Sequence, residues 1–187
     1  GYPKYRELQY GHADGNQRTA AECDVSIRPG WFYHPEEDDR VKSPEQLADL
    51  YYRSVGHNAT LLLNFPVDRE GLIHPIDSAN AVNFHKMIQR ELQHNLVAGM
   101  TPKVSNERGM AFAAKAMTDD SWDTYWATDD GVTSATITFD FKKPQLMNRI
   151  MLQEYIPLGQ RVKKFAVEYL DGKTWRSVEQ GEETTTI

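Results

Sequence analysis

The sequence predicts an α/β portion over residues 1–99, most simply part of a β/α barrel, followed by an incomplete all-β sandwich or jelly roll. Two observations support this division. Apolar runs alternate with amphipathic helices in the first half, whereas the period-two alternation typical of antiparallel strands takes over from Ser134. Residues 100–104 are the expected linker, and the second portion is expected at 105–187.

Two strands and two helices are expected in the first portion. The strands lie near residues 24–28 and 59–65, and the second is a nearly continuous apolar run, typical of a parallel strand covered on both faces. A helix is expected over 44–55, where a serine, a proline and a glutamine supply the N-cap and capping box, and a second helix is capped by Asp77. Two parallel strands cannot close a sheet alone, so we expect the chain to be cut from a longer protein.

The second portion contains three further candidate strands. Alternating apolar and polar residues predict strands at 134–141, 148–155 and 164–170, with proline and glycine residues between them. These are too few to complete a jelly roll.

Composition excludes several classes of function. The net charge is −6 and the lysines and arginines are scattered, which argues against nucleic acid as a partner. No apolar run approaches the roughly 20 residues that a membrane span requires. Because Cys23 is the single cysteine, an intramolecular disulfide is excluded.

The most informative segment is Glu22–His34, which reads ECDVSIRPGWFYH. It combines two carboxylates, an arginine, three aromatic residues and a histidine where a short strand gives way to a Pro-Gly turn. Aromatic ring faces suit the C–H surfaces of a sugar, and charged groups suit its hydroxyls. The segment therefore indicates either a sugar pocket at a strand end or an ordinary strand-to-loop junction.

Three landmarks in order carry a resemblance to a known family: Glu22–His34, the helix at 44–55 and the strand at 58–64. Residues 21 to about 97 resemble the C-terminal portion of the (β/α)8-like catalytic barrel of α-L-fucosidases, glycoside hydrolase family 29, in the branch that prefers α-1,3/1,4-linked fucose. Residues 105–187, with the signature AMTDDSWDTYW, are similar to the N-terminal portion of a discoidin-like (coagulation factor 5/8 type C), galactose-binding-like module.

The resemblance implies a retaining, exo-acting enzyme that removes terminal α-linked L-fucose from fucosylated oligosaccharides or glycoconjugates, with two carboxyl groups about 5 Å apart and no cofactor for catalysis. In relatives the nucleophilic Asp and the usual acid/base Glu would precede Gly1, so the chain alone is expected to be inactive. Glu22 is the rival acid/base candidate; its alternatives are to orient Arg28 or a loop, or to be a plain surface carboxylate. Asp24 is expected on the opposite strand face. A periplasmic or extracellular location is implied.

Trp31, His34 and Arg28 are the candidate substrate contacts. Trp31 aligns with an aromatic residue that the family places against the methyl group of fucose, where a ring would contribute about 1 kcal/mol. Core packing for Trp31 and a loop position for His34 are the alternatives.

In the second module, Asp119 and Thr124 align with positions where relatives hold a structural calcium, with carbonyl oxygens completing the shell. An ordinary acidic loop is the alternative. Two other functions stay open: a non-catalytic fragment that binds carbohydrate or serves as a scaffold, and a different β/α-barrel glycosidase.

Overall fold

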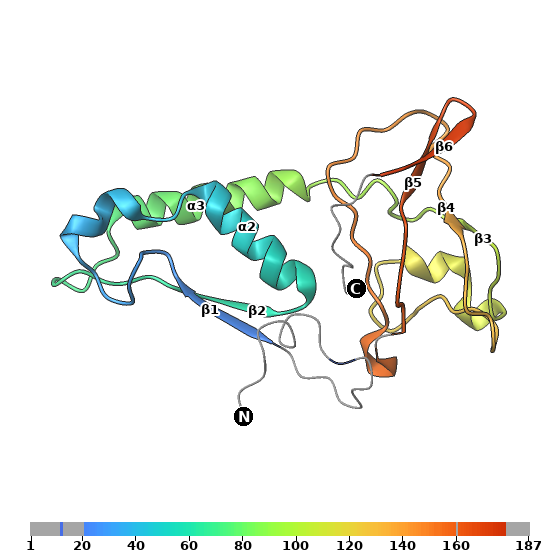
Figure 1. Cartoon of the computed structure of the whole chain (residues 1–187), viewed down its shortest axis with the longest axis horizontal. Coiled ribbons are helices and arrows are strands. Elements are labelled where there is room, and N and C mark those ends of the chain that lie inside the picture. The colour runs from blue at the N-terminus through green and yellow to red at the C-terminus, as the bar shows by residue number, and fades with distance from the viewer. Residues whose placement is uncertain (1–11, 13–20, 160, 179–187) are drawn as a thin grey trace. The chain divides into compact units, whose positions relative to one another are not determined.

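The computed structural model describes residue 12, residues 21–159 and residues 161–178 (Figure 1). Contacts between residues divide the chain into two compact units. One unit holds the described residues up to Arg90 together with those from Gly159 onward, and the other holds Glu91–Leu158. Each unit is described by itself below.

A parallel strand pair forms the frame of the first unit. Strand β1 (Glu22–Ser26) pairs with β2 (Thr60–Asn64), in a register that sets Glu22 opposite Thr60 and Ser26 opposite Asn64. The pairing continues one residue further, since the backbone N–H of Ile27 donates to the carbonyl of Asn64 at 3.0 Å. The two parallel strands expected in the first half are thereby confirmed, with β1 beginning two residues earlier than the sequence suggested.

Helix α2 (Pro44–Ser54) begins with the capping box that the sequence predicts. The backbone N–H of Gln46 donates to Ser43 Oγ at 3.3 Å, and Ser43 N–H donates to Gln46 Oε1 at 2.9 Å. The helix ends in a short 3-10 turn, and Asn58 then adopts a left-handed conformation with φ of 62°. Asparagine tolerates this region better than most residues, so the chain reverses at Asn58.

Helix α3 (Pro75–Glu91) begins two residues before Asp77, which was expected to cap it. Asp77 therefore lies inside the first turn, where its side chain is buried. Figure 1 shows α2 and α3 on the same side of the β1–β2 pair in this view. The two helices meet through Tyr51 and Phe84, whose ring centroids are 6.1 Å apart.

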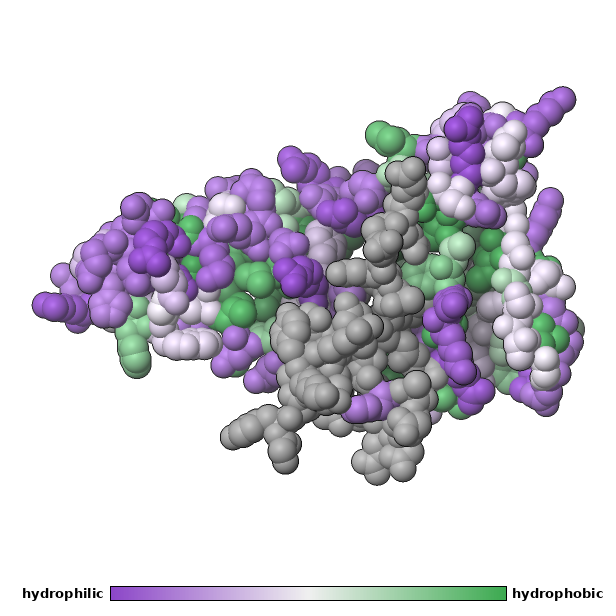
Figure 2. Space-filling view, in the orientation of Figure 1, coloured by the Kyte–Doolittle hydropathy of each residue, from purple (hydrophilic) through white to green (hydrophobic). Residues whose placement is uncertain are grey.

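The buried core of this unit is small. Ile27, just after β1, and Leu47, in the first turn of α2, are almost completely shielded from solvent, whereas Leu62 on β2 is 50% exposed. Figure 2 shows mostly hydrophilic residues over the visible part of α2 and α3, with hydrophobic side chains between the helices and the strands. No helix among the described residues is both long enough and apolar enough to cross a bilayer.

The remaining strands are short and antiparallel. In the second unit β3 (Lys103–Val104) pairs with β4 (Ile137–Thr138), and after residue 161 β5 (Glu168–Asp171) pairs with β6 (Thr174–Ser177) through a turn in which Gly172 has φ of 63°.

The strand prediction for the second portion was only partly right. The antiparallel pairing agrees with the expectation, but only two residues of 134–141 form a strand, 148–155 forms none, and β3 lies inside the predicted linker. Sequence alternation marks the two faces of a segment, but a strand also needs a partner backbone within hydrogen-bonding distance. Short 3-10 helices lie between these strands, at Met110–Phe112, Ala114–Met117 and Ile156–Leu158.

Candidate functional site

The candidate site lies beyond the carboxyl ends of β1 and β2. The segment Pro29–His34, called the aromatic loop here, follows β1 after Ile27 and Arg28 and leads into a 3-10 helix at Pro35–Arg40. The carboxyl edge of parallel strands in α/β proteins is where loops carry binding and catalytic groups. The position of the loop thus agrees with the expectation of a site at a strand end.

Arg28 anchors the base of the aromatic loop. Its Nε and Nη2 atoms donate to the two carboxylate oxygens of Asp77, both at 2.8 Å, and Nη1 lies 2.9 Å from Oδ1 of Asp38. The side chains of Arg28 and Asp77 have no solvent exposure. Burial alone would lower the pKa of Arg28, but the bonds to Asp77 and Asp38 outweigh it and raise that pKa, so the guanidinium stays charged.

The ring of Tyr33 lies close to this guanidinium. The Cζ atom of Arg28 lies 4.6 Å from the ring centroid of Tyr33, and the Tyr33 ring lies 5.9 Å from that of His74. A cation over an aromatic face is attracted to the ring electrons. The pKa of the Tyr33 hydroxyl is raised, first by desolvation and then by the negative charge of Asp38.

Asn64, the last residue of β2, connects the two strand ends. Its side-chain Nδ2 donates to Oγ of Ser26 at 3.1 Å and to the backbone carbonyl of Trp31 at 3.1 Å. A carbonyl oxygen can only accept, so the amide nitrogen of Asn64 must face Trp31. Asn64 therefore links β2 directly to the aromatic loop.

The side chains of Trp31 and His34 are open to solvent. Trp31 is 51% exposed and the His34 side chain is 55% exposed, so neither is a core residue. Arg28 differs from them, because its donors are bonded to Asp77, Asp38 and the carbonyl of His34. The structure thus brings the three predicted substrate contacts into one segment, with Arg28 inside the protein and the other two at its surface.

Glu22 lies at the opposite end of the strand. It is the first residue of β1, and four residue steps of about 3.3 Å each separate it from Ser26, where the site begins. The partners of Arg28 are Asp77 and Asp38, so the suggestion that Glu22 orients Arg28 was wrong. Glu22 and Asp24 are both exposed on the same face, which corrects the expectation of opposite faces, since residues two apart on a strand point the same way.

Three residues that shape the site were not found from the sequence: Asp77, Asp38 and Asn64. Asp77 lies where an acidic residue commonly caps the start of a helix, so nothing in the sequence indicates its long-range pairing with Arg28. Asn64 ends an apolar strand just before Pro66, and a polar residue at that edge was an available signal.

In the second unit, Asp119 and Thr124 lie together in an exposed turn. Thr124 Oγ1 donates to Asp119 Oδ2 at 2.7 Å, and the backbone N–H of Ser121 donates to Oδ1 at 3.0 Å. The hydrogen bond from Thr124 comes first among the causes that lower the pKa of Asp119. Within the described part of the chain no group of three acidic, histidine or cysteine side chains is arranged to hold a metal.

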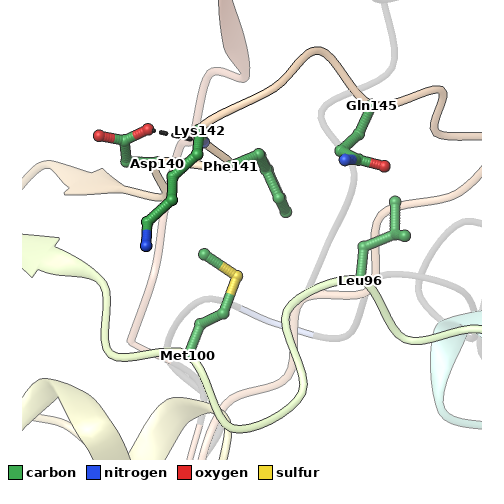
Figure 3. A pocket seen from close by; sticks show the side chains of 6 residues that line it. All are labelled: Leu96, Met100, Asp140, Phe141, Lys142 and Gln145. Atoms are coloured by element: carbon green, nitrogen blue, oxygen red, sulfur yellow. Dashed lines mark hydrogen bonds between the residues drawn. The ribbon is translucent and has the colours of Figure 1, made fainter.

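A shallow cavity of about 320 Å³ also lies in the second unit (Figure 3). Its lining mixes apolar and polar side chains, namely Leu96, Met100, Asp140, Phe141, Lys142 and Gln145. The acidic group is already engaged, since the backbone N–H of Lys142 donates to Asp140 Oδ1 at 3.0 Å. None of the residues predicted to bind substrate or calcium lines this cavity.

Known proteins are similar to this chain over most of its length. A rice protein (Oryza sativa subsp. japonica) named "Putative alpha-L-fucosidase 1" is 39% identical over 99% of this chain and 35% of its own length. Alpha-L-fucosidase 1 of Arabidopsis thaliana is 36% identical over 86% of this chain and 32% of its own length.

Solved structures give the same result. The crystal structure named "putative alpha-L-fucosidase from Bacteroides thetaiotaomicron" matches with a TM-score of 0.83 and 43% identity, over 98% of this chain and 40% of the other. A Ruminococcus gnavus GH29 fucosidase in complex with fucose matches with a TM-score of 0.79 and 36% identity, over 91% of this chain and 35% of the other. This chain is homologous to part of the α-L-fucosidases of glycoside hydrolase family 29.

The second part of the chain also matches a known domain family. Residues 101–187 match the F5/8 type C domain family, whose domain is β-rich, in agreement with the antiparallel pairs after residue 100. The chain spans about a third of the length of the curated fucosidases that it matches.

Proposed function

We propose that the chain is part of a retaining, exo-acting α-L-fucosidase that hydrolyses terminal α-linked L-fucose. The observation that carries the proposal is the match, over 98% of the chain at 43% identity, to the structure named "putative alpha-L-fucosidase from Bacteroides thetaiotaomicron". The geometry supports it, since exposed Trp31 and His34 stand at the carboxyl edge of a parallel strand pair, where β/α barrels place their active sites.

In this proposal β1 and β2 are two strands of a (β/α)8-like barrel, and residues 101–187, which include β3, belong to a discoidin-like module. Each of the two strands has one partner among the described residues, and a barrel would supply the others. The nucleophilic Asp and the acid/base Glu would come from sequence before Gly1. Glu22 is not proposed as the acid/base, because it lies at the amino end of β1.

Within the site, Trp31 would contact the C5 methyl group of fucose and His34 a hydroxyl. Fucose is a 6-deoxy sugar, so its methyl group is its most apolar point and suits an exposed indole face. We propose terminal fucose in α-1,3/1,4 linkage on oligosaccharides or glycoconjugates as the substrate, a periplasmic or extracellular location, and no cofactor for catalysis. A structural calcium near Asp119 and Thr124 is part of the same proposal.

The test is hydrolysis of an aryl α-L-fucoside by the whole protein that carries this chain, with proton NMR following the released sugar. We expect α-L-fucose as the first product, because retaining glycosidases preserve anomeric configuration. The 187-residue chain alone is expected to release none. Release of β-L-fucose would contradict the retaining mechanism, and no release by the whole protein would contradict the proposed function.

A second candidate, a carbohydrate-binding or scaffolding role, is favoured by the F5/8 type C match at 101–187. A glycan array probed with the full chain tests it. Binding to galactose- or fucose-bearing glycans that survives Trp31→Ala would support a site outside the aromatic loop. Absence of binding to every such glycan would contradict this role.

A further inference from the structure

Two of the three predicted sugar contacts, Trp31 and His34, share one structural feature: the backbone carbonyl of each accepts a hydrogen bond from a side chain at a strand end or two residues beyond one. The carbonyl of Trp31 accepts from Asn64 Nδ2 at 3.1 Å. The carbonyl of His34 accepts from Arg28 Nη1 at 3.4 Å. The aromatic loop is therefore tied at its third and last residues while its Trp31 and His34 side chains stay open to solvent.

Asn64 is itself fixed by the sheet. Its backbone carbonyl accepts from Ile27 N–H at 3.0 Å, and its side chain also donates to Oγ of Ser26. The same Ser26 hydroxyl oxygen accepts a hydrogen bond from the backbone N–H of Arg28 at 3.3 Å. The amide that reaches Trp31 thus starts from a paired strand and has little freedom to turn away.

Arg28 is fixed more strongly still. Both carboxylate oxygens of Asp77 bind it at 2.8 Å, Asp38 binds it at 2.9 Å, and Tyr33 of the aromatic loop lies over its guanidinium. A planar guanidinium bonded at two edges by carboxylates has one orientation. The N–H group that Arg28 donates to the carbonyl of His34 is consequently held in a fixed position.

We propose that Asn64 and Arg28 are positioning residues that hold the backbone of the aromatic loop so that Trp31 and His34 meet the ligand in one geometry. The identity of that ligand as fucose rests on the proposed function. A loop held in its bound conformation before binding does not have to be ordered by the ligand, and this improves affinity. Neither residue needs to touch the sugar for this effect.

The first experiment observes the loop without any ligand. The full chain is labelled with 5-fluorotryptophan, and the Trp31 resonance is identified by its loss in Trp31→Phe. Asn64→Asp removes the N–H donors but keeps the size of the side chain, and we expect it to shift or broaden the Trp31 resonance. The matched control is Asn80→Asp, because Asn80 Nδ2 makes the same kind of bond, at 3.0 Å, to the carbonyl of Lys42 outside the loop. The control should leave the Trp31 resonance in place.

The second experiment measures the consequence for catalysis in the whole protein with an aryl α-L-fucoside. Asn64→Asp is expected to raise KM about fivefold, the effect of losing the hydrogen bond to the Trp31 carbonyl, with kcat within about twofold of the parent. A residue that served only stability would lower the fraction of folded enzyme, which reduces apparent kcat and leaves KM unchanged. Asn80→Asp should alter neither parameter beyond about twofold.

The two experiments separate the inference from the function on which it rests. An unchanged Trp31 resonance in Asn64→Asp, or a loss of kcat without a rise in KM, would overturn the positioning role. If the whole protein hydrolyses no fucoside while the Trp31 resonance still responds to Asn64→Asp, the positioning stands and the fucose assignment is wrong. Should Asn64→Asp reduce the far-UV circular dichroism of the chain, Asn64→Ser, which adds no charge, is measured against the same criteria.

Discussion

Arg28 and Asp77, 49 positions apart in the chain, form an ion pair through two hydrogen bonds of 2.8 Å, and both side chains are completely shielded from solvent. The pair ties Arg28, two residues beyond the end of β1, to the first turn of α3. A buried charge without its partner costs several kcal/mol, so the two residues depend on each other. The segment that precedes the aromatic loop is therefore held to a helix as well as to a strand.

We expect Asp77→Ala to lower the free energy of unfolding by about 3–5 kcal/mol, because Arg28 would be left buried with only Asp38 as a charged partner. Urea denaturation followed by circular dichroism measures the change. The control is Asp49→Ala, which removes an exposed partner 3.6 Å from Arg53 and should cost less than about 1 kcal/mol. Equal costs for the two variants would show that the buried pair adds nothing beyond a surface contact.

The capping box of α2 gives a second prediction. Ser43→Ala should destabilise the chain by about 1 kcal/mol, because the N–H of Gln46 loses its acceptor. Since the two side chains cap each other's backbone, Ser43→Ala combined with Gln46→Ala should cost less than the sum of the single variants. Thermal denaturation of the three variants measures this coupling, and strict additivity would contradict a cooperative box.

These two contacts show how far sequence reasoning reaches in this chain. The capping box of α2 was predictable because its donors and acceptors lie within three residues of one another. The parallel pairing of β1 and β2 was predictable because the apolar run before Pro66 suits a covered strand. Both inferences use local patterns that physical chemistry converts into structure without knowledge of the remaining chain.

The parts that sequence reasoning missed depend on distant partners. Nothing near Asp77 indicates that its carboxylate binds Arg28, and a carboxylate at a helix start is normally interpreted as a cap. The segment 148–155 alternates like a strand but lacks a ladder partner among the described residues. The residue types of the site were therefore recognisable, while the partner that Arg28 selects was not.

A third prediction concerns the titration of Asp119. The hydrogen bonds from Thr124 and from the N–H of Ser121 hold the pKa of Asp119 below its ordinary value of 3.8. The ionised carboxylate therefore stabilises the folded state above pH 3.8. This stabilisation is lost as the pH falls through the lowered pKa. Thr124→Val should raise the pKa of Asp119 toward 3.8, as followed by carboxyl-carbon NMR. Thr128→Val is the control, because the Thr128 hydroxyl donates to the backbone carbonyl of Val132 and not to Asp119. This variant should leave the pKa of Asp119 unchanged. A pKa of Asp119 that is the same in both variants would show that Thr124 does not stabilise its charged form.

The last prediction separates recognition from stability at Trp31. The indole is 51% exposed, so Trp31→Ala should lower the free energy of unfolding of the full chain by only about 1 kcal/mol, since half of the side chain is withdrawn from water. In the whole protein the same variant should lower kcat/KM for an aryl α-L-fucoside about tenfold or more, because stacking against the sugar would be lost in the transition state. Trp122→Ala, at a tryptophan that is 76% exposed in the second unit, is the matched control and should leave kcat/KM unchanged. A large loss of stability with unchanged kcat/KM would mean that Trp31 packs against the protein and does not contact the sugar.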